Sequence, residues 1–304
     1  MKYRLHLSYL LIAIFCLLLW GCSGSSSASR KEHSGPPRDS TPKVLTPSAD
    51  GVTVYQNDLA SIDASNTSQG YVMVKYNGTN EKVKLQITCP DQSCYTYLIS
   101  DRGAYDTFPL TAGNGSYALQ VLENVAGDTY TVSLAQSINV SIEDEFLPFL
   151  YPNQYVNFHT DSKAVSKGSD LAKDTYSDLD VVQNIYNYVI KNISYDTEKA
   201  QNVSYGYVPD IDDTLSSKKG ICFDYAALMT SMLRSQNIPT KLEVGYSGDA
   251  YHAWISTYID DKGWVDDIIQ FNGNTWQIMD PTLAATNDSA AVKKYVGDGS
   301  HYVV

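Results

Sequence analysis

Between residues 52 and 142, hydrophobic and polar side chains alternate in short runs, which is typical of half-buried β-strands. The runs lie at residues 52–55, 71–76, 83–87, 95–98, 117–122 and 130–134. Two dipeptides that favour tight hairpin turns separate neighbouring runs, Asn77-Gly78 and Asn114-Gly115. Roughly six or seven short strands in about 90 residues predict an antiparallel β-sandwich.

A helical period replaces this alternation further along the chain. Residues 178–191 carry apolar side chains at positions i, i+3 and i+7, namely Val182, Ile185 and Val189. This spacing predicts a helix with one buried stripe and a cap at Ser177. Residues 163–176 do not indicate one structure. The segment 197–219 is rich in Asn, Asp, Ser and Tyr, so we predict a long loop there.

A second helix is predicted at residues 223–234, which contain no Gly or Pro. Cys222 then lies at or just before the helix N-terminus, after Gly220, where unpaired amide donors and the positive end of the helix dipole point. That position favours a thiolate, the nucleophilic form of cysteine. The alternative is an inert, buried core residue, because apolar Phe223 and Ala226 lie close by in the sequence.

Strands are predicted after this helix at residues 240–246, 252–259, 264–271 and 275–279. His252 begins one of these strands and Asp280 follows another. A cysteine attacks a carbonyl carbon, a histidine takes and returns protons, and a carboxylate orients the imidazole. The three side chains can therefore form one catalytic site if the helix packs on the sheet.

These residues resemble the transglutaminase-like superfamily, whose core is a papain-like thiol fold. The matching motifs occur in this order: Ile193-Ser194-Tyr195-Asp196, Gly220-Ile221-Cys222, Asp224-Tyr225-Ala226, Leu233-Arg234, Asn237-Ile238-Pro239, His252-Ala253-Trp254 and Asp280-Pro281-Thr282. The resemblance implies that Cys222 is the nucleophile, His252 the general base and acid, and Asp280 the orienting carboxylate. The Cys222 amide would be one oxyanion donor. Tyr195 and Tyr207 are candidates for the second donor.

The predicted fold class is therefore α+β. A papain-like or transglutaminase-like core, in which a helix carrying Cys222 packs on an antiparallel sheet, follows an all-β sandwich. The expected boundaries are a signal peptide at 1–21, a flexible tether at 22–50, the sandwich at 51–143, a linker and helical lead-in at 144–176, and the catalytic domain at 177–304.

The N-terminus has the pattern of a targeting segment. Lys2 and Arg4 precede an apolar stretch at residues 7–20 that is short for a membrane span. The end of this stretch resembles a bacterial lipoprotein signal, with cleavage before Cys22 and acylation of its thiol, although Trp20 replaces the usual small residue. An uncleaved anchor helix is the alternative. Both interpretations place the protein at the cell membrane, tethered to its extracytoplasmic face.

Cys89 and Cys94 flank a four-residue turn. Outside the cytoplasm, such a pair favours a disulfide across a hairpin, with two free thiols as the alternative. Asp210, Asp212 and Asp213 match no metal-ligand spacing well, so we expect a solvated acidic segment and no metal or cofactor.

The net charge of −12, with no Lys/Arg cluster in the folded part, argues against a nucleic-acid partner. The expected function is a membrane-tethered thiol enzyme that acts on amide bonds through a thioester, a cysteine peptidase or amidase. A protein-cross-linking transglutaminase and a non-catalytic surface binding or adhesion module are the alternatives. We expect a peptide or protein substrate, cell-wall peptides included, and a monomer held to the membrane by its lipid.

Overall fold

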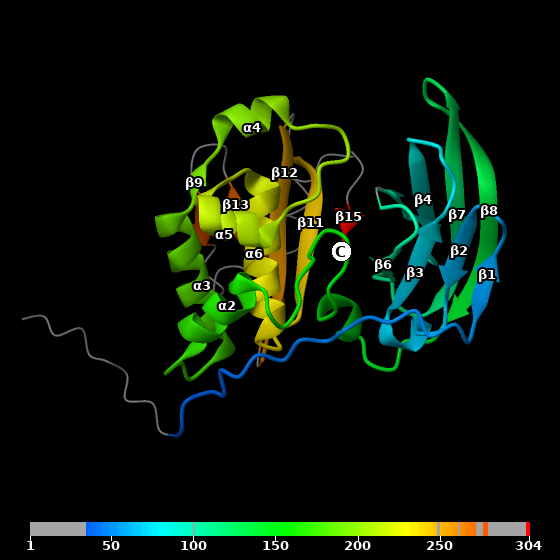
Figure 1. The fold of residues 1–304 in the computed structure, drawn as a ribbon. Coiled ribbons are helices and arrows are strands. Elements are labelled where there is room, and N and C mark those ends of the chain that lie inside the picture. Colours follow the sequence, from blue (N-terminus) through cyan, green and yellow to red (C-terminus); the bar gives the residue numbers. More distant parts are fainter. Residues whose placement is uncertain (1–34, 100, 248–249, 261, 272–275, 279–301) are drawn as a thin grey trace, which may run out of the picture. The chain divides into compact units, whose positions relative to one another are not determined.

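The strands between residues 54 and 140 form two four-stranded antiparallel sheets (Figure 1). The computed structural model describes residues 35–304 except 100, 248–249, 261, 272–275 and 279–301. One sheet has the order β1 (Val54–Gln56), β2 (Ala60–Asp63), β3 (Tyr71–Tyr76), β6 (Tyr105–Pro109). The other has the order β5 (Cys94–Leu98), β4 (Val83–Thr88), β7 (Gly115–Ala126), β8 (Thr129–Val140).

The two sheets share one hydrophobic core, as a β-sandwich requires. Ile62 and Val74 of the first sheet belong to the same buried cluster as Leu85 and Leu119 of the second. Within β4, buried and partly exposed positions alternate strictly, so the sequence pattern is confirmed there. The sequence patterns missed β2 and β6, because all four residues of β2 are buried and β6 ends in a proline.

The predicted disulfide between Cys89 and Cys94 is wrong, because both thiols are free. Cys94 pairs with Thr88 in the ladder, and the Cys89 amide bonds the Ser93 carbonyl at 2.8 Å. The two cysteines are therefore offset by one position, and neighbouring positions of a strand point to opposite faces of a sheet. Cys89 is buried in the sandwich core while Cys94 is exposed to solvent.

The helices of the second half are α2 (Lys163–Ala172), α3 (Asp178–Asn192), α4 (Thr197–Asn202), α5 (Ile211–Ser217) and α6 (Cys222–Ser235). Single-turn 3-10 helices lie at Thr67–Gln69 and Leu147–Phe149. The helix predicted at 178–191 is confirmed, and Ser177 and Asp180 form a reciprocal capping box at its start.

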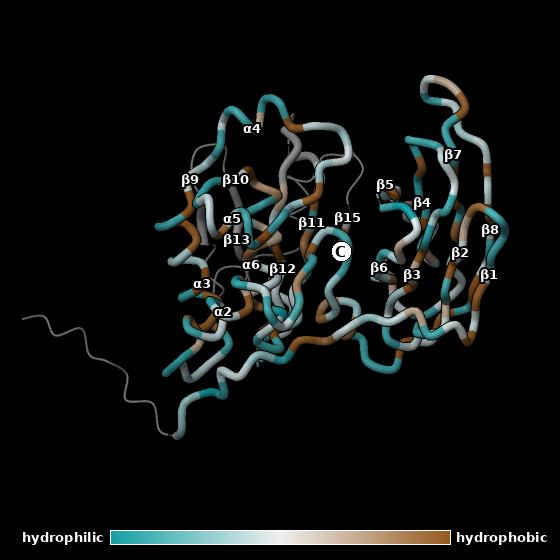
Figure 2. Tube along the Cα trace, viewed as in Figure 1, coloured by the Kyte–Doolittle hydropathy of each residue, from teal (hydrophilic) through white to brown (hydrophobic). Residues whose placement is uncertain are grey.

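The loop predicted at 197–219 is wrong in part, because α4 and α5 lie within it. Both helices are too short to show an apolar period, but aspartates begin them: Asp196 and Asp210 accept hydrogen bonds from first-turn amides. Figure 2 shows hydrophilic residues along α4, which agrees with its exposed position. Asp212 accepts from the Lys163 and Ala164 amides at 3.0 Å each, which caps α2.

A five-stranded sheet completes the second half, in the order β14 (Trp276–Ile278), β13 (Gly263–Phe271), β12 (Ala250–Ile259), β11 (Thr240–Ser247), β15 (Tyr302–Val303). Helix α6 contacts β11 and β12 on one side and α2, α3 and α5 on the other (Figure 1). The predicted α+β core is therefore present, with the Cys222 helix packed on an antiparallel sheet.

Part of the predicted tether is held against these helices. The Arg38 guanidinium lies 2.7 Å from the Asp178 carboxylate, and its backbone amide bonds the Thr175 carbonyl. The Lys43 amide bonds the Ser235 carbonyl. Over the part of the chain that the structure describes, no helix combines the length and apolarity needed to cross a bilayer. Cys22 and the predicted signal peptide lie outside the described residues.

Candidate active site

Cys222 is the first residue of α6, with Ile221 as the N-cap. The structure therefore confirms that this cysteine lies at a helix N-terminus. Gly220, two positions before Cys222, approaches the helix so closely that a Cβ built on it would lie 2.7 Å from the Asp224 Cβ. A side chain at position 220 would displace the first turn of α6, and with it Cys222.

Two distant motifs meet next to this helix start. Strand β9 (Ser194–Tyr195) pairs in parallel with β10 (Lys219–Gly220), and Gly220 lies opposite Tyr195. The Tyr225 hydroxyl donates to the Ile193 carbonyl at 2.6 Å. Burial raises the pKa of Tyr225 to about 12, so this hydroxyl stays a donor at neutral pH. The motif at residues 193–196, about 27 positions before the cysteine motif, therefore forms the wall beside the start of α6.

A buried carboxylate organises the first turn of α6. Asp224 is fully buried, and its carboxylate accepts from the Ile221 amide at 2.8 Å and from the Lys199 ammonium at 2.8 Å. It also accepts from the Tyr207 hydroxyl. Burial and the Asp224 charge raise the pKa of Tyr207 well above its usual range, so the phenol remains protonated and donating. Tyr207 is thus engaged with Asp224 and is a poor candidate for an oxyanion donor.

The Cys222 thiol lies beside β12. Burial raises the pKa of Cys222 above its ordinary value, and hydrogen bonding to the backbone of Ala253 and Phe223 opposes this rise without cancelling it. The net direction is opposite to the one expected from the helix position alone, because the dipole argument left out the cost of burying a charge. A thiolate at neutral pH therefore requires a cation close to the sulfur.

His252 is the residue that the sequence predicts to supply that cation. Its backbone lies in β12 opposite Gly245, directly before Ala253, whose backbone contacts the Cys222 sulfur. The side chain of His252 lies outside the described residues, and so does Asp280. The convergence of the three side chains therefore stays a prediction. What the structure establishes is that β12 brings the position next to His252 against the thiol.

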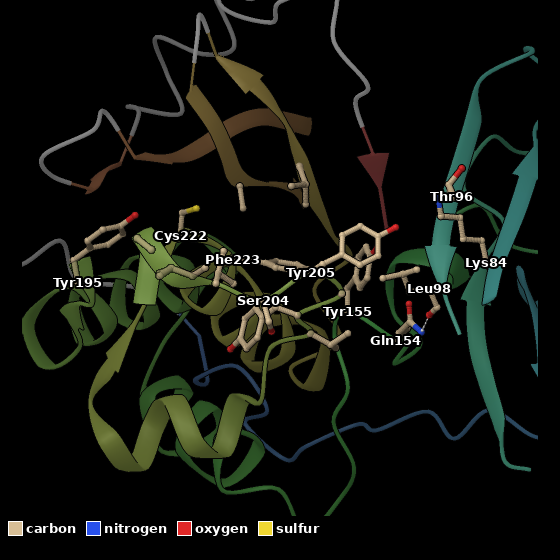
Figure 3. Close-up of a pocket in the computed structure, with 18 residues that line it drawn as sticks. Lys84, Thr96, Leu98, Gln154, Tyr155, Tyr195, Ser204, Tyr205, Cys222 and Phe223 are labelled. Atoms are coloured by element: carbon tan, nitrogen blue, oxygen red, sulfur yellow. Dashed lines mark hydrogen bonds between the residues drawn. The ribbon is translucent and has the colours of Figure 1, made fainter. Parts of the chain in front are cut away.

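A pocket of about 890 Å³ opens at Cys222 (Figure 3). Its lining is rich in aromatic side chains and includes Tyr155, Tyr195, Tyr205, Tyr207 and Phe223. Tyr195 and Cys222 lie at one end of the group of residues drawn. Other lining residues, among them Lys84 and Leu98, come from the sandwich strands β4 and β5. The cysteine is half-buried and reaches a cavity large enough for several residues of a peptide.

The sequence did not lead us to predict that Lys199 and Asp224 support the candidate site. The signal was present, since Asp224 follows Cys222 by two positions and a buried acid at a helix start requires a cation or donors nearby. Nothing in the sequence indicated which lysine would be the partner. Within the described residues, no group of three or more His, Cys, Asp or Glu side chains could hold a metal ion.

Residues 166–266 match the family model described as Transglutaminase-like superfamily. The chain is 30% identical over 118 residues to the UPF0252 protein MJ1282 of Methanocaldococcus jannaschii, covering 34% of each chain. It is also 30% identical over 107 residues to the kyphoscoliosis peptidase of Mus musculus, covering 31% of this chain and 16% of the relative. The chain thus matches about a third of the first relative's length and less of the second's.

Among solved structures, a candidate cysteine protease of Cytophaga hutchinsonii is similar at 15% identity with a TM-score of 0.36. That similarity covers 83% of this chain and 78% of the other. The matched segment of the sequence, residues 166–266, contains α6, which carries Cys222, and β12, whose Ala253 backbone contacts the thiol. Through this segment, about a third of the chain, the protein is similar to the transglutaminase-like superfamily.

Proposed function

We propose that this protein is a thiol hydrolase that cleaves amide bonds of peptides, with Cys222 as its nucleophile. One observation carries the proposal: the Cys222 thiol is at the first position of α6, in the wall of a cavity of about 890 Å³, with the backbone of Ala253 against it. An inert core cysteine would be packed on all sides, without an adjoining cavity. The residue that precedes Ala253 on β12 is moreover a histidine, His252.

The proposed reaction begins with the Cys222 thiolate attacking the amide carbon of the substrate. The negative charge moves to the carbonyl oxygen, where the Cys222 backbone amide and the Tyr195 hydroxyl donate to it. The His252 imidazolium then gives its proton to the leaving amine as the carbon–nitrogen bond breaks. A thioester remains on Cys222. Water, deprotonated by the now neutral His252, attacks the thioester and releases a carboxylic acid and the thiolate.

Tyr195 is preferred to Tyr207 as the second donor because of the surroundings of each hydroxyl. Tyr207 donates to Asp224, while Tyr195 lines the cavity at the Cys222 end (Figure 3). Burial raises the pKa of Tyr195, and a charge on the Cys222 sulfur raises it further. The second effect means that Tyr195 and the reacting sulfur are close enough to interact. The proposal gives Asp280 the role of orienting His252.

The proposal also places the enzyme outside the cytoplasm, held by a lipid on Cys22. This part of the proposal is supported by the basic residues Lys2 and Arg4, the apolar stretch at 7–20 and the cysteine that follows it. Expression with labelled palmitate tests this part by itself, because Cys22→Ala should lose the label and leave the membrane fraction. Retention in the membrane fraction without the label would point to the uncleaved anchor helix.

The activity is tested by incubating the protein with a tryptic peptide mixture in the presence of hydroxylamine, against Cys222→Ala. A thioester intermediate gives peptide hydroxamates, and in ordinary water it gives free acids. We expect both products from the wild-type protein and neither from the variant. Products in which a lysine amine, rather than water, has resolved the thioester would assign a cross-linking transglutaminase instead. Turnover that survives in Cys222→Ala would contradict the proposal.

A further inference from the structure

Lys84 belongs to the sandwich, yet it lines the same pocket as Cys222. In β4 it lies between the buried residues Val83 and Leu85, so its side chain leaves the sandwich core and points outward. Thr96 and Leu98 of the neighbouring strand β5 line the pocket beside it. Figure 3 shows Lys84 and Thr96 at the opposite end of the group from Cys222 and Tyr195.

The sandwich strand and the Cys222 side of the pocket are joined by the segment between α4 and α5. Gly206 has φ +80, and a Cβ built there would lie 2.6 Å from the Leu98 Cδ1, so this backbone passes directly over β5. The next residue, Tyr207, bonds the buried Asp224 two positions after Cys222. Thus the sandwich is part of the pocket wall, and the position of Lys84 is tied to that of the nucleophile.

Lys84 is the one charged side chain lining this pocket among the residues that the structure describes. The protein as a whole has a net charge of −12, so a pocket with a cation and no described acid is a local exception. No described carboxylate forms an ion pair with Lys84. Its ammonium instead lies 4.1 Å from the centre of the Tyr130 ring. The cation is held in place by an aromatic ring, and no carboxylate of the described residues neutralises its charge.

The ammonium stays charged at neutral pH. Burial acts to lower the pKa of Lys84, but hydrogen bonding to Tyr130 and the interaction with Tyr205 raise it above its ordinary value. A half-buried, positioned ammonium with no carboxylate partner among the described residues can bind an anion. A lysine ammonium is a compact point charge with three donors, which suits a single carboxylate.

Aromatic side chains fill the distance between the two ends of the pocket. The Tyr155 and Phe223 rings meet edge-on with centroids 5.2 Å apart, and Tyr205 lies in the same region (Figure 3). Such surfaces bind extended chains through apolar contact without selecting one sequence. Specificity then falls to the polar groups at the ends, of which Lys84 carries the charge.

We propose that Lys84 forms a carboxylate-binding subsite, so that the sandwich selects peptides with an acidic group remote from the amide that Cys222 attacks. This inference rests on the proposed hydrolase function and names its substrate class. The carboxylate comes either from an Asp or Glu side chain or from the C-terminus of the peptide. Both sources present the same group to Lys84, and the test separates them.

The test measures hydrolysis of peptide sets that differ by one group. N-acetyl hexapeptide amides of mixed composition carry Glu at one defined position, and a matched set carries Gln there. A third set has Gln with a free C-terminal carboxylate. Each set is given to the wild-type protein, to Lys84→Gln and to Lys84→Glu. The control is Lys82→Gln, because Lys82 is exposed, lies just before the same strand and does not line the pocket.

We expect the wild-type protein to hydrolyse one acidic set about fivefold faster, in kcat/KM, than the neutral set, which is the effect of one partly exposed ion pair. Lys84→Gln should abolish that preference, so that the acidic and neutral sets are hydrolysed at equal rates, and Lys84→Glu should reverse it. Lys82→Gln should behave as wild type. The set that is preferred identifies the source of the carboxylate.

Equal rates for all three sets in the wild-type protein would overturn the subsite while leaving the hydrolase proposal intact. A preference that survives in Lys84→Gln would overturn it as well. If no set is hydrolysed, alkylation of Cys222 by iodoacetamide provides the second measurement. Acidic peptides should then protect Cys222 better than neutral ones in the wild-type protein and not in Lys84→Gln, and equal protection would contradict the subsite.

Discussion

The Lys199 ammonium lies 2.8 Å from the Asp224 carboxylate, and this ion pair joins α4 to the helix that carries Cys222. The Asp224 side chain is fully buried, while the Lys199 side chain is 28% exposed. The same carboxylate accepts from the Ile221 amide at the N-cap and from the Tyr207 hydroxyl in the pocket wall. One acid therefore fixes the start of the nucleophile helix and the wall of the pocket together.

Replacing Asp224 should affect stability and activity alike. Asp224→Ala leaves the Lys199 charge and the Ile221 amide without their partner, which costs about 3 kcal/mol in the free energy of unfolding for a buried pair. Urea denaturation measures the loss. Asp213→Ala is the matched control, since Asp213 is an exposed acid of α5, and it should change stability by less than about 0.5 kcal/mol. Equal losses of stability in the two variants would show that the ion pair and hydrogen bonds of Asp224 do not stabilise the protein.

The two tyrosines of the pocket should separate catalysis from stability. Tyr195→Phe removes the proposed oxyanion donor, so kcat should fall roughly a hundredfold with an unchanged melting temperature. Tyr207→Phe removes a donor to Asp224 and should lower stability by about 1 kcal/mol, with a smaller loss of kcat. The reverse pattern would exchange the roles of the two residues. Steady-state kinetics and thermal unfolding of both variants make the comparison.

Arg234 should be needed for folding although it is remote from the thiol chemistry. Its guanidinium is fully buried and donates to the backbone carbonyl oxygens of Tyr151, Thr240 and Val304 at 2.7–2.9 Å. Burial lowers its pKa to about 9. Arg234→Met removes the hydrogen bonds of the guanidinium to these carbonyls, of which the Val304 oxygen keeps the Leu242 amide as a donor, so we expect a loss of about 3 kcal/mol or more in urea denaturation.

The control for Arg234 is Arg102→Met. Arg102 is exposed and rests over the Tyr76 ring, so its loss should cost less than about 1 kcal/mol. Arg234→Lys should recover little, because three separate carbonyls match the fork of a guanidinium better than one ammonium. Full recovery by lysine would mean that charge alone is required at this position.

The free thiols of the sandwich should differ in reactivity. Cys94 is exposed, whereas burial raises the pKa of Cys89 to about 11. Since the thiolate is the form that reacts, an alkylating reagent at pH 8 should modify Cys94 readily and Cys89 only after denaturation. Peptide mapping of Cys222→Ala, with and without denaturant, shows which cysteine is labelled. A Cys89–Cys94 cross-link in a map made without reductant would restore the disulfide that the structure excludes.

Much of this fold could be predicted where one local rule decided the outcome. Strict alternation located β4, and an apolar period with a serine cap located α3. The short helices α4 and α5 escaped because tertiary contacts, rather than periodicity, stabilise elements of six and seven residues. The disulfide failed for a related reason: spacing along the chain does not reveal a one-position offset between strands.

In the candidate site too, local features could be predicted and contacts between distant segments could not. Cys222 could be located from a break, a helix and a motif, because all three are local. Its pKa direction could not, since the desolvation that raises it depends on how closely α6 packs on β12. Nor could the partners of Asp224 or the contribution of Lys84 be predicted, because each is joined to the site by a contact between segments far apart in the sequence.

The central claim is that Cys222 becomes a nucleophile only with the help of His252. Without a cation nearby, burial keeps the Cys222 pKa above its ordinary value, so the thiolate should be scarce below pH ~8.5. An imidazolium next to the sulfur stabilises the thiolate and extends it to lower pH, down to the pKa of the pair. The two situations predict different pH profiles for the same chemical reaction.

The most direct measurement is therefore the rate of Cys222 alkylation against pH, followed by peptide mapping so that Cys94 does not contribute, in the wild-type protein and in His252→Ala. We predict that the wild-type rate remains high well below pH ~8.5, and that the variant rate rises only above that pH. Identical profiles, with both thiols titrating above pH ~8.5, would contradict the ion pair and with it the assignment of this protein as a thiol hydrolase.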